Sequence, residues 1–86
     1  MAHLLLIEDD EEVRAAMTFL LQRAGHTVTV LPDGRRAVNV CRKHGIEVVI
    51  TDIVMPEQEG INTIQALRKK VPEVGIVAIS GGGRYG

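Results

Sequence analysis

Acidic and hydroxyl side chains follow three apolar segments of this 86-residue chain. Glu8 and Asp9 come directly after the run LLLI, Asp52 ends the segment VVITD, and Ser80 ends the segment GIVAIS. Carboxylate oxygens are hard ligands of the kind that Mg²⁺ prefers, and protein-bound Mg²⁺ often keeps several waters and bridges to phosphate. If the three segments end close together, their side chains could bind a divalent cation and handle a phosphoryl group.

Three carboxylates held together would repel one another. Two unit charges about 4 Å apart repel by roughly 1 kcal/mol in water and by about 4 kcal/mol at an effective dielectric constant of 20. A cluster of Glu8, Asp9 and Asp52 therefore requires either a raised pKa or a bound cation.

The elements that would position these side chains alternate along the chain. Predicted strands cover 3–7, 26–31, 46–51 and 75–80, and segments with helical periodicity lie between them. Such alternation predicts an α/β fold with a parallel sheet, right-handed crossovers and helices on its faces. Because ligands of open parallel sheets bind beyond the carboxyl ends of the strands, Glu8, Asp9 and Asp52 are expected at one crevice if the first and third strands are neighbours.

The apolar pattern also predicts which faces are buried. Segments 4–7, 48–51 and 76–79 are apolar on both faces, which favours central positions, whereas the alternation in 26–31 favours an edge. The first helix should bury the face formed by Val13, Ala16, Met17, Leu20, Leu21 and Ala24. The second should bury Ala37, Val38 and Cys41, and the third Ile61, Ile64, Leu67 and Val71.

Each motif taken alone has a simpler interpretation. The acidic run EDDEE suits a helix N-terminus, where Asp9 and Glu12 could form a pair like a capping box. Asp52 alone could be a turn or cap residue, and Ser80 a small polar residue at a strand end. The glycines at 81–83 lack the lysine and hydroxyl spacing of a P-loop. The combination of acids and a hydroxyl at successive strand ends favours a shared site.

Composition excludes several classes of protein. The 10 basic and 11 acidic residues give a net charge of −1, which predicts no binding of nucleic acid or anionic membrane. Cys41 is the one cysteine, so neither a disulfide nor a cysteine metal site is expected, in keeping with a reducing cytoplasm. The N-terminal apolar run is too short for a signal peptide or a membrane span. The length allows one small domain.

The sequence resembles a response-regulator receiver domain of two-component signalling. The resemblance rests on LLLIEDDEEVR at the first strand and helix, TDIVMPEQEG at the third strand and its loop, and IVAIS followed by glycine, and it runs through the whole chain in order. It implies a flavodoxin-like doubly wound sheet, here (βα)3β with strand order 2-1-3-4. It also implies a phosphoacceptor rather than an enzyme, with a sensor histidine kinase or a histidine phosphotransfer domain as partner.

The resemblance also assigns roles to residues. Asp52 would accept the phosphoryl group. Mg²⁺ would be bound by Asp9, Asp52 and the backbone carbonyl of Val54, with Glu8 acting mainly through a metal-bound water. Ser80 would hydrogen-bond the phosphoryl group in the activated state, and Gly81 would leave room for it.

The sequence departs from the family pattern after the fourth strand. The family has a fourth helix, a fifth strand and a fifth helix, and its fifth strand ends in a lysine that pairs with the phosphoryl group. Lys69 and Lys70 fall in the last turn of the third predicted helix and do not match it. We therefore expect a truncated receiver domain over 1–80, with 81–86 as a loop or disordered end and with impaired phosphorylation and switching. We also expect self-association through the exposed edge of the fourth strand or an uncovered sheet face.

Two other functions compete with this hypothesis. A receiver-like module that binds a partner without phosphorylation would share the fold, and a phosphorylation assay distinguishes the two. A nucleotide-binding fragment would need a glycine-rich loop after the first strand, where this chain has EDDEE.

Overall fold

The computed structural model describes residues 1–52 and 59–79, which form four strands and three helices in strict alternation. The elements are β1 His3–Ile7, α1 Glu11–Arg23, β2 Thr27–Leu31, α2 Ala37–His44, β3 Val48–Asp52, α3 Glu59–Lys70 and β4 Gly75–Ile79. The predicted order of strands and helices is confirmed.

The four strands form one parallel sheet in the order β2-β1-β3-β4. Leu5 of β1 lies beside Thr29 of β2 and Val49 of β3, and Val49 in turn lies beside Ile76 of β4. This order is the flavodoxin-like arrangement predicted from the sequence. It makes β1 and β3, whose ends carry the acids, direct neighbours.

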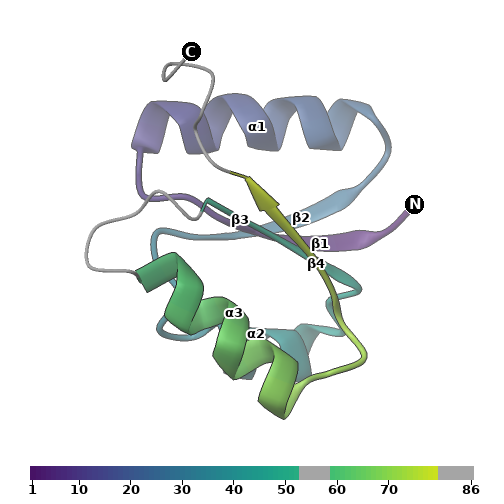
Figure 1. The fold of residues 1–86 in the computed structure, drawn as a ribbon. Helices are drawn as coiled ribbons and strands as arrows, with labels where there is room; N and C mark the ends of the chain where they lie inside the picture. Colours follow the sequence, from purple (N-terminus) through teal and green to yellow (C-terminus); the bar gives the residue numbers. More distant parts are fainter. Residues whose placement is uncertain (53–58, 80–86) are drawn as a thin grey trace.

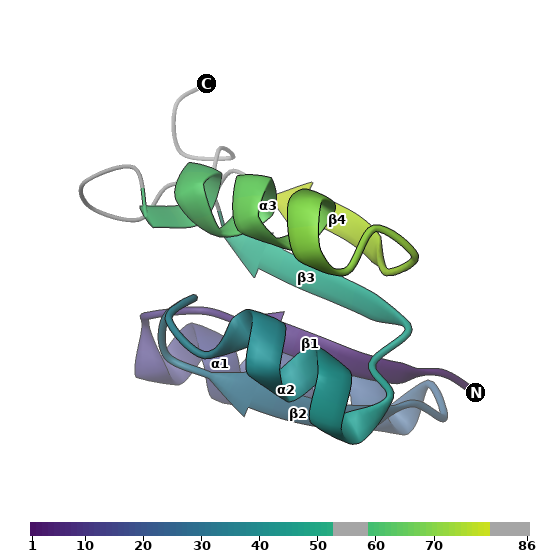
Figure 2. The ribbon, with the colours of Figure 1, turned by 90° about the horizontal axis from the view of Figure 1, so that it is seen from below.

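The helices cover the sheet unequally. Helix α1 lies on one face, and α2 and α3 lie side by side on the other (Figures 1 and 2). The buried core lies mainly between the sheet and the α2–α3 layer. Its members are Leu5, Ile7, Leu31, Ala37, Cys41, Ile46, Val49, Leu67 and Val71. Helix α2 buries Ala37 and Cys41 as predicted and ends at Gly45, whose φ of 63° is left-handed.

Helix α1 begins at an aspartate cap within the acidic run. Asp10 has extended backbone dihedrals, and its Oδ1 accepts a hydrogen bond of 3.0 Å from the N–H of Val13. Glu11 and Glu12 then stand in the first turn, where they interact favourably with the helix dipole. The cap is thus Asp10, and the alternative of an Asp9–Glu12 capping pair is wrong. Asp9 is left available for the crevice.

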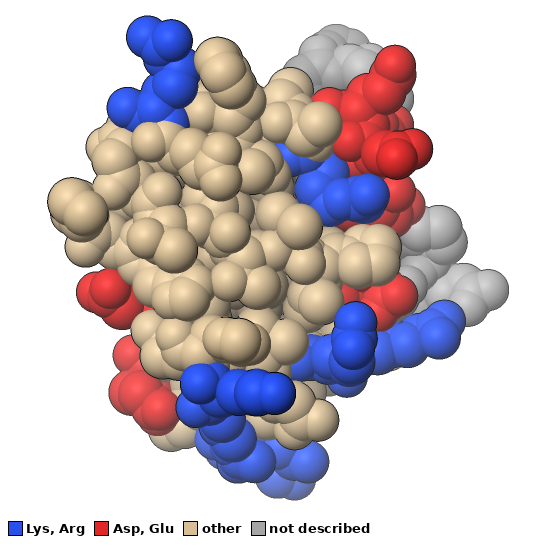
Figure 3. Space-filling model, turned by 180° about the vertical axis from the view of Figure 1, so that it is seen from behind, with Lys and Arg blue, Asp and Glu red and all other residues tan. Residues whose placement is uncertain are grey.

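The predicted buried face of α1 is not buried. None of its side chains is fully enclosed: Met17 and Leu21 are half-buried, while the exposed fractions are 41% for Val13 and 63% for Leu20. A single helix cannot cover a four-stranded sheet face, so apolar groups on both flanks of α1 stay in contact with solvent. On the side where β2 forms the sheet edge, the surface is broad and uncharged, with acidic and basic groups mainly at its margins (Figure 3).

The predicted face of α3 is rotated relative to the sheet. Leu67 and Val71 are buried as expected, but Ile61 is 45% exposed and Thr63 is buried in its place. The cause is a close approach between α3 and the turn before α2. A Cβ at Gly34 would overlap the Thr63 side chain, so glycine allows the contact that brings Thr63 inward.

Strand β4 lies at an edge of the described sheet. It pairs with β3 on one side, and Val77 is 48% exposed. The apolar pattern of β4, taken alone, favoured a central position, but the predicted order 2-1-3-4, with the fourth strand at an exposed edge, is confirmed for the described strands, and β2 is an edge strand as predicted. Among the described residues, no helix is long and apolar enough to cross a bilayer.

Candidate functional site

Strand register brings the acids together. Ile7 lies beside Thr51 in the parallel pairing of β1 with β3, so the residues that come next, Glu8 and Asp52, meet at the carboxyl end of the sheet. One ligand atom from each of Glu8, Asp9 and Asp52 can be chosen so that all three lie within 4.8 Å of one another. The structure thus places three of the predicted ligands in one cluster.

The three carboxylates differ in their access to solvent. Glu8 is buried, with 2% of its surface exposed, whereas Asp52 is partly exposed and Asp9 is exposed. A cation or a phosphoryl donor could therefore approach Asp9 and Asp52 from solvent, while Glu8 forms the floor of the site.

The Glu8 backbone and one of its carboxylate oxygens are held by hydrogen bonds. Its N–H donates to the carbonyl of Leu31 at 3.1 Å, and its own carbonyl accepts from Arg14 Nη1 at 2.9 Å. Its Oε2 accepts from the N–H of Asp10 at 3.1 Å. The other oxygen, Oε1, is buried and has no hydrogen-bond partner among residues 1–52 and 59–79. This oxygen is the part of Glu8 that still lacks a partner there.

Burial changes the protonation of Glu8. The pKa of Glu8 is raised from 4.5 to about 7; loss of solvent is the largest cause, and the nearby Asp52 and Asp9 carboxylates also contribute to the rise. The hydrogen bond from the Asp10 N–H acts in the opposite direction. The repulsion expected within the acidic cluster is thus visible as a carboxyl group that keeps its proton close to neutral pH.

These residues fit a magnesium ion. A buried carboxylate oxygen without a donor lacks compensation for its lost hydration, and a cation would supply it. The three groups offer oxygen ligands alone, from separate backbone positions, which suits a hard cation that keeps several waters.

Several predicted site residues lie outside the part of the chain that the structure describes. These are Val54, Ser80 and Gly81. Lys69 and Lys70 lie in the last turn of α3, as predicted. Sequence reasoning missed Arg14 and Asp10, which hold Glu8 together with Leu31. The position of Arg14 in the first turns of α1, six residues after Glu8, is the feature of the sequence that could have suggested this contact.

Comparison with known proteins agrees with this geometry. The sequence profile of the response regulator receiver domain matches residues 4–85. The chain is 34% identical over 82 residues to the sensor kinase CckA of Brucella abortus, covering 93% of this chain but 9% of that protein. It is 33% identical over 81 residues to the response regulator receiver protein CpdR of the same organism, covering 94% of this chain and 68% of CpdR.

Solved structures show the same fold. The response regulator TrrA of Thermotoga maritima, crystallised with Mg²⁺ and BeF, superposes with a TM-score of 0.86 at 25% identity, covering 99% of this chain and 74% of that one. A structure of the histidine kinase ThkA in complex with TrrA gives a TM-score of 0.85 at 25% identity, covering 99% of this chain and 73% of that one. The profile match spans nearly all of the chain, and with the parallel 2-1-3-4 sheet it shows that the chain belongs to the response regulator receiver domain family.

Proposed function

We propose that this chain is a phosphoacceptor that takes a phosphoryl group onto Asp52 in the presence of Mg²⁺. The observation that carries the proposal is the convergence of Glu8, Asp9 and Asp52 within 4.8 Å at the carboxyl end of the sheet. Two facts about a relative support it. TrrA has been crystallised with Mg²⁺ and BeF and in complex with a histidine kinase.

The reaction needs little from the protein beyond a nucleophile and its position. An Oδ atom of Asp52 attacks the phosphorus of a phosphohistidine or of a small acyl phosphate. A new P–O bond forms as the P–N bond, or the P–O bond to the acyl group, breaks, and the leaving group keeps the electron pair. The product is an aspartyl phosphate, and Asp52 is partly exposed, as a nucleophile toward a second protein must be.

Glu8 and Asp9 would hold the metal beside that nucleophile, together with Asp52. When bound, Mg²⁺ neutralises the charge of the acids and of the transferring phosphoryl oxygens. The backbone carbonyl of Val54 as a further ligand, and Ser80 as a donor to the phosphoryl group, belong to the same proposal and rest on the resemblance.

The partner would be a sensor histidine kinase or a histidine phosphotransfer domain in the cytoplasm. The likeness to TrrA, solved in complex with the kinase ThkA, supports this class of partner. We expect phosphorylation of residues 1–86 by themselves to be slow. No residue in this sequence matches the lysine that the family pattern places at the end of a fifth strand, so one charge that would stabilise the phosphoryl group is missing.

The test is incubation of the purified chain with Mg²⁺ and acetyl phosphate, followed by intact-mass spectrometry. We expect one added phosphoryl group, absent in Asp52→Asn and absent with EDTA. Asp33→Asn is the matched control, since it removes a carboxylate from an exposed turn where Asp33 contacts Arg35. If a chain extended through the lysine strand also stays unmodified, the proposal is wrong and a receiver-like module that only binds a partner is favoured.

We also propose that the 86-residue chain self-associates through β4. This strand, GIVAI, carries no charged residue, and neither a lysine nor a proline protects its edge. Partly exposed apolar side chains stand on both of its faces: Val77 toward the α1 side and Ile76 toward the α3 side.

Sedimentation velocity over a range of concentrations tests this proposal. We expect a dimer whose population grows with concentration and which Val77→Lys abolishes. Val30→Lys is the control because Val30 is similarly exposed, at 41%, on the opposite edge strand β2. A single monomeric species at all concentrations would overturn the proposal.

A further inference from the structure

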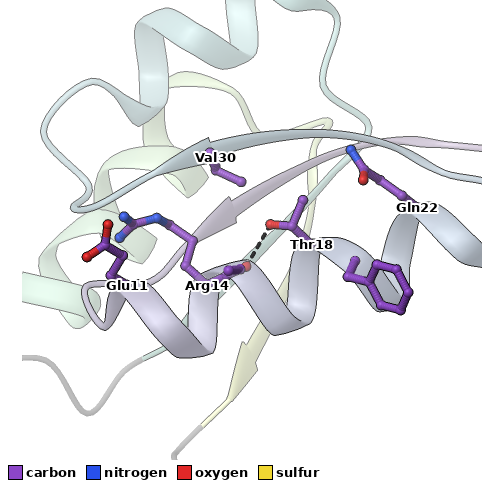
Figure 4. Close-up of a pocket in the computed structure, with 7 residues that line it drawn as sticks. Glu11, Arg14, Thr18, Gln22 and Val30 are labelled. Carbon is purple, nitrogen blue, oxygen red and sulfur yellow. Dashed lines mark hydrogen bonds between the residues drawn. The ribbon is translucent and has the colours of Figure 1, made fainter.

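Arg14 links helix α1 to the end of β1. Its Nη1 donates a 2.9 Å hydrogen bond to the backbone carbonyl of Glu8. The backbone of Arg14 is itself fixed, because its N–H donates to the carbonyl of Asp10 and its carbonyl accepts a 2.7 Å bond from Thr18 Oγ1 (Figure 4). The guanidinium group thus extends from a well-anchored turn.

The contact lies on the backbone side of Glu8. With Arg14 on its carbonyl, Leu31 on its N–H and Asp10 on Oε2, Glu8 has one polar atom, Oε1, without a partner in the described part of the chain. Rotation of the peptide that follows Glu8 would also move Asp9, the next ligand. Arg14 therefore restrains the backbone that carries two of the three carboxylates.

We propose that Arg14 is a positioning residue for the metal site, and that it makes the site favour Mg²⁺ over Ca²⁺. The inference rests on the proposed magnesium site. Mg²⁺ demands near-octahedral geometry at short distances, whereas Ca²⁺ accepts six to eight ligands in flexible arrangements. A backbone held in place therefore favours binding of Mg²⁺ over binding of Ca²⁺.

The direction in which metal affinity changes when Arg14 is replaced distinguishes a positioning role from a purely electrostatic one. Arg14 is a cation close to an anionic site, so its charge alone repels a divalent ion, and neutralising it would tighten binding. Positioning predicts the opposite result, since a residue that orients metal ligands typically changes affinity by about 10- to 100-fold when it is removed.

The experiment measures Mg²⁺ and Ca²⁺ affinity by isothermal titration calorimetry at pH 8 for wild type, Arg14→Gln and Arg23→Gln. Arg23→Gln makes the same change of charge in the last turn of the same helix, roughly 14 Å away at 1.5 Å per residue. We expect Arg14→Gln to weaken Mg²⁺ binding about tenfold and Ca²⁺ binding less than about threefold. Arg23→Gln should match wild type.

Several outcomes would overturn the inference. Arg14→Gln could bind Mg²⁺ as tightly as Arg23→Gln or more tightly, or it could lose both ions equally while its circular dichroism stays native. If Arg14→Gln does not fold, Arg14→Lys decides, because lysine keeps the charge but loses the planar fork. A selective loss of Mg²⁺ affinity in Arg14→Lys supports positioning, and wild-type binding of both ions refutes it. Wild type that binds no Mg²⁺ refutes the proposed metal site itself.

Discussion

Replacement of Glu8 by glutamine should stabilise the metal-free protein at neutral and alkaline pH. The pKa of Glu8 is about 7 in the folded chain and 4.5 in the unfolded one, so between these values the folded state binds more protons. Stability that depends on this proton is fully present below pH 4.5 and is lost as the pH rises through 7. At about 1.4 kcal/mol per pH unit, the loss is at most about 3 kcal/mol.

A loss of this size is large for such a chain. Domains have a free energy of unfolding of roughly 0.05–0.15 kcal/mol per residue, which gives about 4–13 kcal/mol for this length. Glutamine in place of Glu8 carries no charge at any pH. We therefore expect Glu8→Gln to equal wild type near pH 4 and to exceed it by up to about 3 kcal/mol at pH 8.

Urea denaturation in EDTA, followed by far-ultraviolet circular dichroism, measures the difference at each pH. Glu12→Gln is the matched control, since it makes the same chemical change in the exposed first turn of α1. Saturating Mg²⁺ at 100 times the wild-type Kd should raise wild-type stability by about 2.7 kcal/mol, and the same Mg²⁺ concentration should raise that of Glu8→Gln by less. A difference between wild type and Glu8→Gln that does not change with pH, or a wild type that is more stable at pH 8 without metal, refutes the reasoning.

Three further predictions follow from the same structure. Mg²⁺ affinity of wild type should fall toward tenfold per pH unit below 7, because a proton competes for Glu8, and calorimetry of Glu8→Gln should show little of this dependence. Gly34→Ala should destabilise the fold by about 1–3 kcal/mol in urea, because its Cβ would overlap Thr63, whereas Gly75→Ala meets ordinary contacts at 3.5 Å and more. Leu67→Ala, at a fully buried position, should cost about 2–5 kcal/mol, and Leu20→Ala, at 63% exposure, less than about 0.5 kcal/mol by the same measurement.

The fold could be predicted because the local apolar patterns and the order of the elements they predict point to the same architecture. Short apolar segments alternate with helical periodicity, and that alternation leaves a parallel sheet as the consistent arrangement. Once β1 and β3 are neighbours, the pairing of Ile7 with Thr51 places Glu8 beside Asp52 without further information. The acids of the site were thus readable from where their strands end.

The errors have physical causes. Periodicity shows that a helix has an apolar face but does not fix its rotation against the sheet. At α3, the absence of a side chain at Gly34 allows Thr63 to be buried against it, and Ile61 is left exposed to solvent. In a run of five acids, composition cannot say which residue caps the helix, and backbone geometry selects Asp10. Arg14 was missed because its contact is with the backbone of Glu8, and a hydrogen bond to a carbonyl leaves no complementary side chain in the sequence.

At Glu8, the clustering of carboxylates that the proposed site requires lowers the stability of the fold. The apolar register of β1 and β3 places Glu8 beside Asp52, and the carbonyl of Glu8 is held by Arg14, so the backbone keeps the acids close together despite their repulsion. Two changes can still reduce the repulsion between the carboxylates: a proton on Glu8 or a cation between them. Because a proton on Glu8 and the proposed cation would compete for the same cluster, protonation, metal affinity and folding stability would change together. If the proposed Mg²⁺ site forms, the bound ion would therefore also offset the repulsion that the folded chain otherwise carries at neutral pH.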